Sequence, residues 1–425
     1  MPERAVILQK PLVLVLAGIL LVVALVASST VLFYMFYALF ALALVSYIWT
    51  RQLVDNLSVE RHLLTKWCVA GDVIHEQFKI TNTSRLPALW LEVRDGSNLP
   101  DYNAGIVENL GGRRSKSWSA RVVCRRRGLY RLGPLEIITG DPFGIFAGIV
   151  RVGHAASFVV YPPIVDLPGI ELPSGRVQGS SRSSARTYQM TTDAATVRPY
   201  APGDSLKRVH WLHTARRGEL QVREFDLEPA GNVWIILDLH RDVHLGEGDD
   251  STEEYAVKLA TAFINKAIRE NKSVGLIAYG SERHVIPQDK GTTHFWRLLE
   301  VLATVTADGT VPLAQVIQDT AVGLSRGMSV VIITPSIDRS WLDQAVGLLN
   351  KNLTPAAVLL DPESFGGQGK AETLAMELLR LGLVARVVER GAHFSTLALT
   401  KREVEEKRRG AERGAVILGR LVRGM

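Results

Sequence analysis

The sequence predicts three structural parts: a transmembrane helical hairpin, an antiparallel β-sandwich domain and a doubly wound α/β domain. Three patterns support this prediction. Residues 12–49 contain no charged side chain, residues 52–165 contain short strands of alternating polarity, and residues 231–395 alternate apolar strands with amphipathic helices. Apolar strands that alternate with helices are typical of a parallel sheet covered by helices on both faces.

The apolar segment 12–49 is too long for one membrane crossing. A helix needs about 20 residues to cross a bilayer core of roughly 30 Å, so this segment predicts two crossings, with a break at residues 28–30. A cleaved signal peptide is the alternative, but its apolar region covers only about 7–15 residues. The apolar sequence here continues through Phe40. We therefore expect residues 1–51 to form a transmembrane hairpin.

Basic residues flank both outer ends of this hairpin. They are Arg4 and Lys10 before it, and Arg51, Arg61 and Lys66 after it. The positive-inside rule places such ends in the cytoplasm, so we expect a multi-pass protein of the cell membrane with its soluble body in the cytoplasm. The net charge of +6 is modest. Anionic lipid head groups explain it at least as well as nucleic acid does, and no nucleic-acid partner is expected.

The chain contains only two cysteines, Cys68 and Cys124. This number fits a reducing compartment and excludes a disulfide framework or a cysteine-rich metal site. We expect both to be small buried side chains.

Residues 52–165 are predicted to form the β-sandwich. DVIHEQFKITN, ALWLEVRD and SWSARVVC alternate with period two, and Asn, Gly and Pro separate them. The segment CRRRGLYRLGPLEIITGDPFGIF predicts a hairpin that ends in a tight turn at residues 141–144. Its three arginines, residues 125–127, are expected to be exposed on an edge strand. Phosphate contact is the alternative.

Three further segments complete the division of the chain. Residues 166–196 are rich in Gly, Ser and Arg and predict a flexible linker or loop. Residues 197–230 form a separate segment dense in charge. Residues 396–425 predict a charged C-terminal helix, which is either solvated, bound to the membrane surface or paired with a partner helix.

Asp238 follows the first apolar strand of the α/β domain, and open parallel sheets bind ligands at the carboxyl ends of their strands. In the von Willebrand factor A fold, this position starts the Mg²⁺ motif D-x-S-x-S. Residues 238–242 read DLHRD instead, so both serines are missing and Arg241 opposes a divalent cation. We expect a degenerate motif at Asp238 and Asp242, with no metal site and no cofactor.

The segment VRPYAPGDSLKRVHWLHTARRGELQVREFD, residues 197–226, is the densest in charge. Pro202 and Gly203 predict a turn, Asp204 a helix cap, residues 205–216 a short helix, and ELQVREF a strand. Asp204 and His210 can face each other, with Ser205 beside them as a nucleophile. Because the chain lacks a Gly-x-Ser-x-Gly elbow, a Walker loop and zinc motifs, the catalytic interpretation has little support.

Two other interpretations of this segment stay open. A structural hub would pair charges between the two domains, using Arg198, Asp204, Arg208, Arg216 and Glu224. A docking surface would use Trp211, Arg216 and Arg217, the residue types that carry interface energy.

The run R-P-Y-x-x-G-D-S-x-K-R-V-H-W-x-x-T-A-R-x-x-E-L-x-V-R-E-F, residues 198–225, resembles the signature of the domain-of-unknown-function number 58 family. The upstream RRGLYRLGPLEIITGDPFGIF and VVYP are similar to the segment that precedes this signature. The resemblance assigns a structural or partner-binding role to the signature residues. These are Arg198, Tyr200, Gly203, Asp204, Arg208, His210, Trp211, Arg216 and Glu219.

The resemblance implies a membrane-anchored prokaryotic protein with a von Willebrand A-like domain. Such proteins are often encoded beside MoxR-type AAA+ ATPases and are thought to act with them in assembling or activating other complexes. No established catalytic activity comes with the family. We therefore expect a non-enzymatic adaptor or scaffold whose partner is a MoxR-type ATPase. The alternative is a hydrolase or cell-wall-related enzyme that uses Asp204 and His210.

Overall fold

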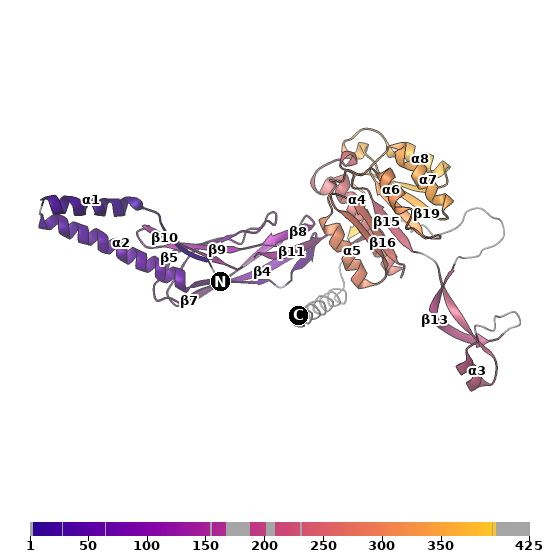
Figure 1. The fold of residues 1–425 in the computed structure, drawn as a ribbon, viewed down its shortest axis with the longest axis horizontal. Helices are drawn as coiled ribbons and strands as arrows, with labels where there is room; N and C mark the ends of the chain where they lie inside the picture. Colours follow the sequence, from indigo (N-terminus) through magenta and orange to yellow (C-terminus); the bar gives the residue numbers. More distant parts are fainter. Residues whose placement is uncertain are drawn as a thin grey trace. The chain divides into compact units, whose positions relative to one another are not determined.

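The computed structural model describes most of the chain (Figure 1). The described residues are 3–27, 29–63, 65–153, 155–166, 188–200, 209–229, 232–392 and 394–396. They form two compact units, Met1–Pro162 and Pro163–Met425. The first unit is rich in β-strands and carries two apolar helices, whereas the second is a mixed α/β structure, so the mixed fold class predicted from the sequence is confirmed in outline.

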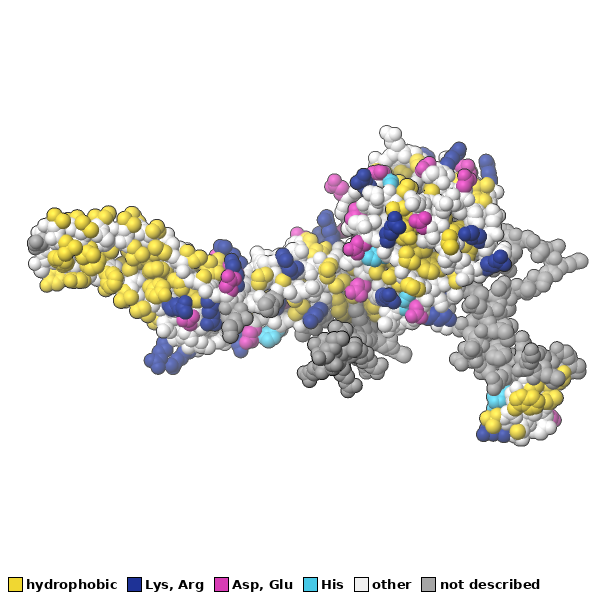
Figure 2. Space-filling model, in the orientation of Figure 1, with side chains coloured by type: hydrophobic (Ala, Val, Ile, Leu, Met, Phe, Trp, Pro, Cys, Tyr) yellow, Lys and Arg dark blue, Asp and Glu magenta, His cyan; other side chains and the backbone are white. Residues whose placement is uncertain are grey.

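Two apolar helices, α1 (Pro11–Ala27) and α2 (Thr30–Asn56), contact each other in the first unit. Their junction falls at the predicted break. By length and composition α2 can cross a membrane, and α1 is a shorter apolar helix of 17 residues. Many of their large apolar side chains face outward, as the yellow surface of Figure 2 shows.

Three sheets make up the rest of the first unit. The first consists of β1 (Glu3–Leu8), β10 (Phe146–Val152), β9 (Leu135–Gly140), β5 (Ala88–Asp95) and β6 (Ile106–Leu110). The second consists of β2 (Leu57–Leu63), β4 (Val73–Asn82) and β7 (Arg114–Val123), and the third of β3 (Trp67–Val69), β11 (Ala156–Tyr161) and β8 (Gly128–Leu132).

Helix α2 extends beyond its apolar part and joins the core of the first unit. Leu53 and Val54 are fully buried and belong to the same apolar cluster as Phe78 and Ile137. Gly148 on β10 allows this close approach, because a methyl group there would overlap Cγ2 of Val54 and lie 3.2 Å from Cγ2 of Thr50. The helix and the sheet therefore form one packed body.

The structure corrects three expectations about this unit. Residues 3–8 are not part of the helical hairpin, because they pair as β1 with β10 across more than 130 residues, a partnership that local sequence patterns do not show. The sandwich is not purely antiparallel, since β3 pairs parallel to β11. The arginines at 125–127 follow β7 rather than lying within an edge strand, and Arg127 is buried.

Arg61 has a structural role in addition to adding basic charge after the apolar segment. Its side chain is only 13% exposed, and its Nε lies 3.1 Å from Oε2 of the buried Glu76. Its guanidinium also pairs with Asp95, and the Tyr102 hydroxyl donates to Glu76. Burial raises the pKa of Glu76, and the nearby Arg61 opposes that rise. The result is a buried network that joins β2, β4 and β5.

The second unit contains a six-stranded sheet. Its order is β17 (Arg283–Asp289), β16 (Val274–Tyr279), β15 (Val233–Leu237), β18 (Ser329–Thr334), β19 (Thr354–Leu360) and β20 (Val384–Val388). Neighbouring strands are parallel, except that β17 at the edge is antiparallel to β16. The continuous apolar runs follow from this arrangement, because the central strands are covered on both faces.

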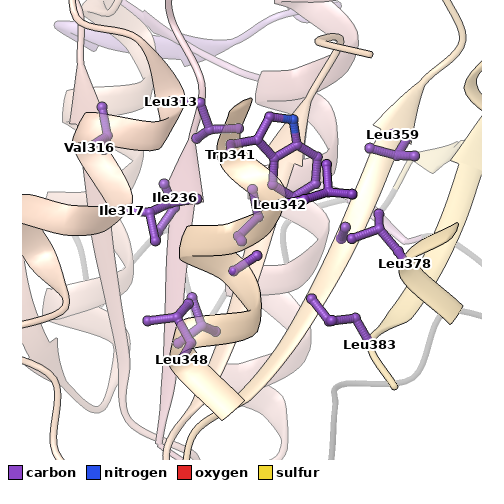
Figure 3. Close-up of a cluster of buried hydrophobic side chains, with 14 of the residues drawn as sticks. Ile236, Leu313, Val316, Ile317, Trp341, Leu342, Leu348, Leu359, Leu378 and Leu383 are labelled. Atoms are coloured by element: carbon purple, nitrogen blue, oxygen red, sulfur yellow. The ribbon is translucent and has the colours of Figure 1, made fainter. Parts of the chain in front are cut away.

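Helices cover both faces of this sheet. They are α4 (Thr252–Arg269), α5 (Thr292–Thr304), α6 (Leu313–Thr320), α7 (Leu342–Asn350) and α8 (Ala371–Arg380), with short 3₁₀ turns at Arg241–Val243, Gly248–Asp250, Arg339–Trp341 and Glu363–Phe365. Ile236 faces a core cluster that includes Trp341 and residues of α6, α7 and α8 (Figure 3). Because side chains alternate along a strand, Ile235 points to the other face, where α4 contacts the sheet and α5.

A separate hairpin precedes the sheet. Strand β13 (Tyr188–Pro199) pairs antiparallel with β14 (Gln221–Pro229), and α3 (Trp211–Arg217) lies between them in the chain. The predicted linker at 166–196 is therefore wrong for residues 188–196, which pair with β14 although they lack a clear alternation. Strand β12 (Val165–Asp166) pairs with β21 (Ser395–Thr396).

Candidate functional site

The first candidate site lies at the carboxyl ends of β15 and β18. Leu237 and Ile333 are neighbours in the parallel register, so Asp238 and Thr334 follow side by side. The Thr334 hydroxyl donates a 2.6 Å hydrogen bond to Oδ2 of Asp238, and the His240 amide donates to Oδ1 at 3.0 Å. Asp238 is 3% exposed. Donors within the chain thus engage both of its carboxylate oxygens.

This arrangement does not fit a tight divalent-metal site. Burial raises the pKa of Asp238, against the lowering effect of its hydrogen bonds with Thr334 and His240. The second acid of the expected degenerate motif, Asp242, is 70% exposed and lies near His240 and Arg241. Across the part of the chain that the structure describes, no group of three or more His, Cys, Asp and Glu side chains is placed to hold a metal ion.

His244 is a member of this site that the sequence did not reveal. Its Nε2 lies 2.9 Å from the carbonyl oxygen of Asp238, and its Nδ1 lies 3.1 Å from the Thr252 hydroxyl. A carbonyl only accepts, so Nε2 carries the proton and Nδ1 is the acceptor in the neutral ring. Burial lowers the pKa of His244. The ring therefore ties the end of β15 to the first residue of α4.

Further hydrogen bonds hold the neighbouring loops at this edge. The Gly309 amide donates to the Leu239 carbonyl at 2.9 Å, and the Arg241 amide donates to the Gly309 carbonyl at 3.0 Å. The Ser336 amide donates to the Thr334 hydroxyl at 2.8 Å. The polar groups at this edge of the sheet thus form hydrogen bonds with one another.

An open groove lies between α6 and the loop that follows β18. Its lining residues are Pro312, Ala314, Gln315, Gln318, Asp319, Val322, Asp338 and Ser340. Hydrogen bonding from Ser340 lowers the pKa of Asp338, which keeps this carboxylate charged. A ligand in the groove would therefore meet negative charge.

The second candidate site is helix α3, at the tip of the β13–β14 hairpin. His210 caps the helix, since its Nδ1 accepts a hydrogen bond from the His213 amide at 3.3 Å, and Gly218 ends it at φ 74°. The His210 amide donates to the Gln221 carbonyl at 2.7 Å, and the Gln221 amide donates to the Thr214 hydroxyl at 3.0 Å. These bonds fasten α3 to β14.

The outer surface of α3 combines apolar and basic side chains. Trp211 is 67% exposed and Leu212 is 59% exposed, and both Arg216 and Arg217 face solvent. Figure 2 shows the apolar surface at this tip, bordered by blue and cyan side chains. Because none of the helix residues is buried, α3 presents its side chains outward.

The signature residues are distributed as follows. His210, Trp211, Arg216 and the exposed Glu219 come together on α3 and its ends, and the Tyr200 amide bonds to the Leu220 carbonyl at 2.9 Å nearby. Arg198 is opposite Val222 in the hairpin. Gly203, Asp204, Ser205 and Arg208 lie outside the described residues, as do the side chains of Arg198 and Glu224.

Two expectations about this segment change. The short helix begins at Trp211 rather than at residue 205, since Val209 forms a β-bridge with Val222 just before it. His210, the base expected in a hydrolase, has its ring in a helix cap.

The chain therefore combines a β-rich unit that carries apolar helices with a mixed α/β unit. Residues 196–365 match the family described as "Protein of unknown function DUF58", which confirms the resemblance for this part of the chain. The uncharacterized protein YeaD of Bacillus subtilis is 25% identical over 203 residues, covering 48% of this chain and 49% of the relative. The uncharacterized protein Rv1480 of Mycobacterium tuberculosis is 27% identical over 175 residues, covering 39% and 54%. The chain thus spans about half the length of these relatives.

Solved structures resemble the chain only weakly. The CARDB domain of a Pyrococcus furiosus protein matches with 16% identity and a TM-score of 0.19, covering 25% of this chain and 92% of that domain. The Pseudomonas fluorescens alkylpurine DNA glycosylase AlkC matches with a TM-score of 0.17 and the same identity, covering 25% of this chain and 30% of the glycosylase. At these scores neither match bears on function.

Proposed function

We propose that this protein is a membrane-anchored adaptor that binds a protein partner through helix α3 and the adjoining α/β domain, without chemistry of its own. The observation that carries the proposal is the pair Trp211 and Leu212, two large apolar side chains more than half exposed beside two arginines. Tryptophan and arginine are the residue types most enriched among binding hot spots. A rigid, capped helix also loses little conformational freedom on binding.

The α/β domain is proposed to be a doubly wound domain of the von Willebrand A type. Its strand order supports this assignment, because strands numbered along the chain lie in the order 3-2-1-4-5-6, with the third strand antiparallel at the edge. Asp238 stands after the first strand, where such domains begin their metal motif. Since internal donors engage its carboxylate here, the domain would bind its partner without a metal bridge.

A MoxR-type AAA+ ATPase is the proposed partner. This proposal comes from the family resemblance, and the basic and apolar side chains of α3 would require an acidic surface with apolar side chains on the ATPase.

Both apolar helices are proposed to cross the membrane, with the β-rich and α/β units in the cytoplasm. The length and apolar composition of α2, and its contacts with α1, support this topology. A C-terminal reporter that is active only in the cytoplasm tests it, and an inactive reporter in a normally expressed fusion protein would refute it.

Co-purification of the full chain from native membranes tests the partner proposal. Trp211→Ser and Leu212→Ser should abolish recovery of the ATPase. Leu129→Ser is a matched control, because Leu129 is 58% exposed on β8, in the β-rich unit. Equal recovery with all three variants would exclude α3 as the docking surface.

A further inference from the structure

The turn at residues 141–144 is built around one buried carboxylate. Asp141 is 1% exposed, its Oδ2 accepts a hydrogen bond from the Phe143 amide at 2.8 Å, and its Oδ1 accepts one from the Phe146 amide at 2.7 Å. Gly144 continues the turn at φ 66°. A turn held in this way displays Phe143 outward, and Phe143 is 52% exposed. The apolar ring of Phe143 is therefore available to contact a surface outside the protein.

This turn contacts the residues just before α1, Gln9 and Lys10, and Tyr47 of α2; these three residues are called the helix root below. The Gln9 and Lys10 amides both donate to the Ile145 carbonyl, at 2.8 and 3.2 Å. The Lys10 ammonium donates to the Phe143 carbonyl at 3.2 Å, immediately before α1 begins. On the other side of the turn, the ring of Phe146 packs edge-on against Tyr47 of α2 at 5.6 Å. Figure 1 shows β10 at this end of the first unit.

The length of the helices brings this root to the bilayer surface. The 17 residues of α1 rise about 26 Å at 1.5 Å per residue, somewhat less than a bilayer core of roughly 30 Å. A short span draws its flanking residues toward the membrane. Beyond Tyr47, α2 enters the protein core at Leu53. The level of Tyr47, Lys10 and Phe143 is therefore the interfacial level, where aromatic and basic side chains are favoured.

Charge at this level favours an anionic surface. The exposed Lys10 ammonium has three N–H donors, so phosphate oxygens can bind alongside the Phe143 carbonyl. Arg51 is 52% exposed and shares Asp55 with Arg4, at 3.0 and 3.9 Å. Two arginines against one aspartate leave a net positive charge near the helix root. Such clusters attract anionic lipid head groups.

We propose that the turn at residues 141–144 is a lipid-binding element, in which Phe143 inserts into the head-group layer and Lys10 binds the phosphate of an anionic phospholipid. This inference rests on the membrane anchoring proposed above. It adds a second, interfacial contact that fixes the orientation of the β-rich unit on the bilayer.

Depth-dependent quenching tests this inference on the full chain. An NBD fluorophore is attached through Phe143→Cys, in a background carrying Cys68→Ala and Cys124→Ala whose Tm matches that of the wild type. The protein is placed in nanodiscs of phosphatidylglycerol and phosphatidylcholine that contain a lipid with a quencher either near the head group or, in separate discs, in the acyl chain. Val22→Cys on α1 and Leu129→Cys on β8 are the reference positions, with exposed fractions of 61% and 58%.

We expect the head-group quencher to act at position 143, the acyl-chain quencher to act at position 22, and neither to exceed background at position 129. If position 143 matches position 129 while position 22 is quenched, the inference is wrong although the membrane anchor stands. If position 22 is also unquenched, the membrane anchor itself fails and the inference falls with it.

A charge substitution tests the part assigned to Lys10. Omitting phosphatidylglycerol should reduce quenching at position 143 in the parent protein, and Lys10→Gln should remove this lipid dependence. Lys66→Gln, which removes an exposed lysine beside β3, is the matched control and should retain the dependence. An unchanged lipid dependence in Lys10→Gln would refute the phosphate contact.

Discussion

The Thr334 hydroxyl donates a 2.6 Å hydrogen bond to the Asp238 carboxylate, joining the ends of two adjacent parallel strands across 96 residues of sequence. The same hydroxyl accepts a hydrogen bond from the Ser336 amide. The Thr334 side chain thus provides a hydrogen-bond donor for the buried Asp238 carboxylate and an acceptor for a backbone amide of the next loop. The polar side chains at this edge of the sheet therefore form hydrogen bonds with other groups of the same domain.

Replacing Thr334 by Val should destabilise the α/β unit. The substitution keeps the shape of the side chain but leaves buried groups unsatisfied, at a cost of about 1–3 kcal/mol for each group. Hydrogen exchange in peptides covering β15 and β18 measures the local unfolding free energy. Thr334→Ser should restore most of it. Thr304→Val removes an exposed hydroxyl on α5 and should change stability by less than about 0.5 kcal/mol; equal losses in both valine variants would contradict the assignment.

Acid should weaken the contact that His244 makes between β15 and α4. Because burial lowers the pKa of His244, the unfolded chain binds a proton at a higher pH than the folded protein does. The stability contributed by His244 is therefore complete above the ordinary histidine pKa of about 6.5 and is lost as the pH falls below it. Asp238 acts in the opposite direction, since burial raises its pKa.

Comparison of the wild type with His244→Gln isolates the histidine contribution. Their difference in Tm should shrink between pH 7.5 and pH 5.5, values chosen to lie on either side of about 6.5. His62→Gln is the control, because the side chain of His62 is 62% exposed. A constant difference across this pH range would show that the pKa of His244 is the same in the folded and the unfolded protein, which would contradict the prediction.

Removing Arg61 should destabilise the β-rich unit strongly. Arg61→Met leaves Glu76 and Asp95, which are 0% and 3% exposed, without their cation. Breaking a buried ion pair in this way costs about 3–5 kcal/mol. Arg94→Met removes an exposed arginine that pairs with Glu92 at 2.6 Å, and it should change stability little. Urea denaturation of the full chain in detergent compares the two variants, and similar losses would show that burial of the network is unimportant.

Gly148→Ala should loosen the attachment of α2 to the β-rich unit. The added methyl group overlaps Val54, so the helix must shift from β10. Overpacking of this kind costs about 1–3 kcal/mol. Gly347→Ala is the control, because nothing lies within 4 Å of the added carbon in helix α7 and alanine should stabilise that helix by up to about 1 kcal/mol. Cysteine cross-linking between α2 and β10 should fall only in Gly148→Ala.

Periodicity in the sequence was enough to predict the apolar helices and their break, and the alternation of apolar strands with amphipathic helices in the α/β unit. These features depend on repeating contacts between near neighbours in the chain. Helix α6 was missed, because only eight residues carry its pattern. The extent of β13 was missed as well, since its strand structure depends on pairing with β14 rather than on its own alternation.

By itself, the sequence determined the apolar helices near the N-terminus, the strand and helix classes and the presence of a charged signature, because composition and spacing show which side chains are buried against one face. Only the tertiary structure decided what the polar residues do. It paired Arg61 with Glu76 and Asp95. It also formed hydrogen bonds from Thr334 and His244 to Asp238, and from Lys10 to the carbonyl of Phe143. These contacts join residues far apart in the chain, and the geometry that brings them together arises from strand order and helix packing.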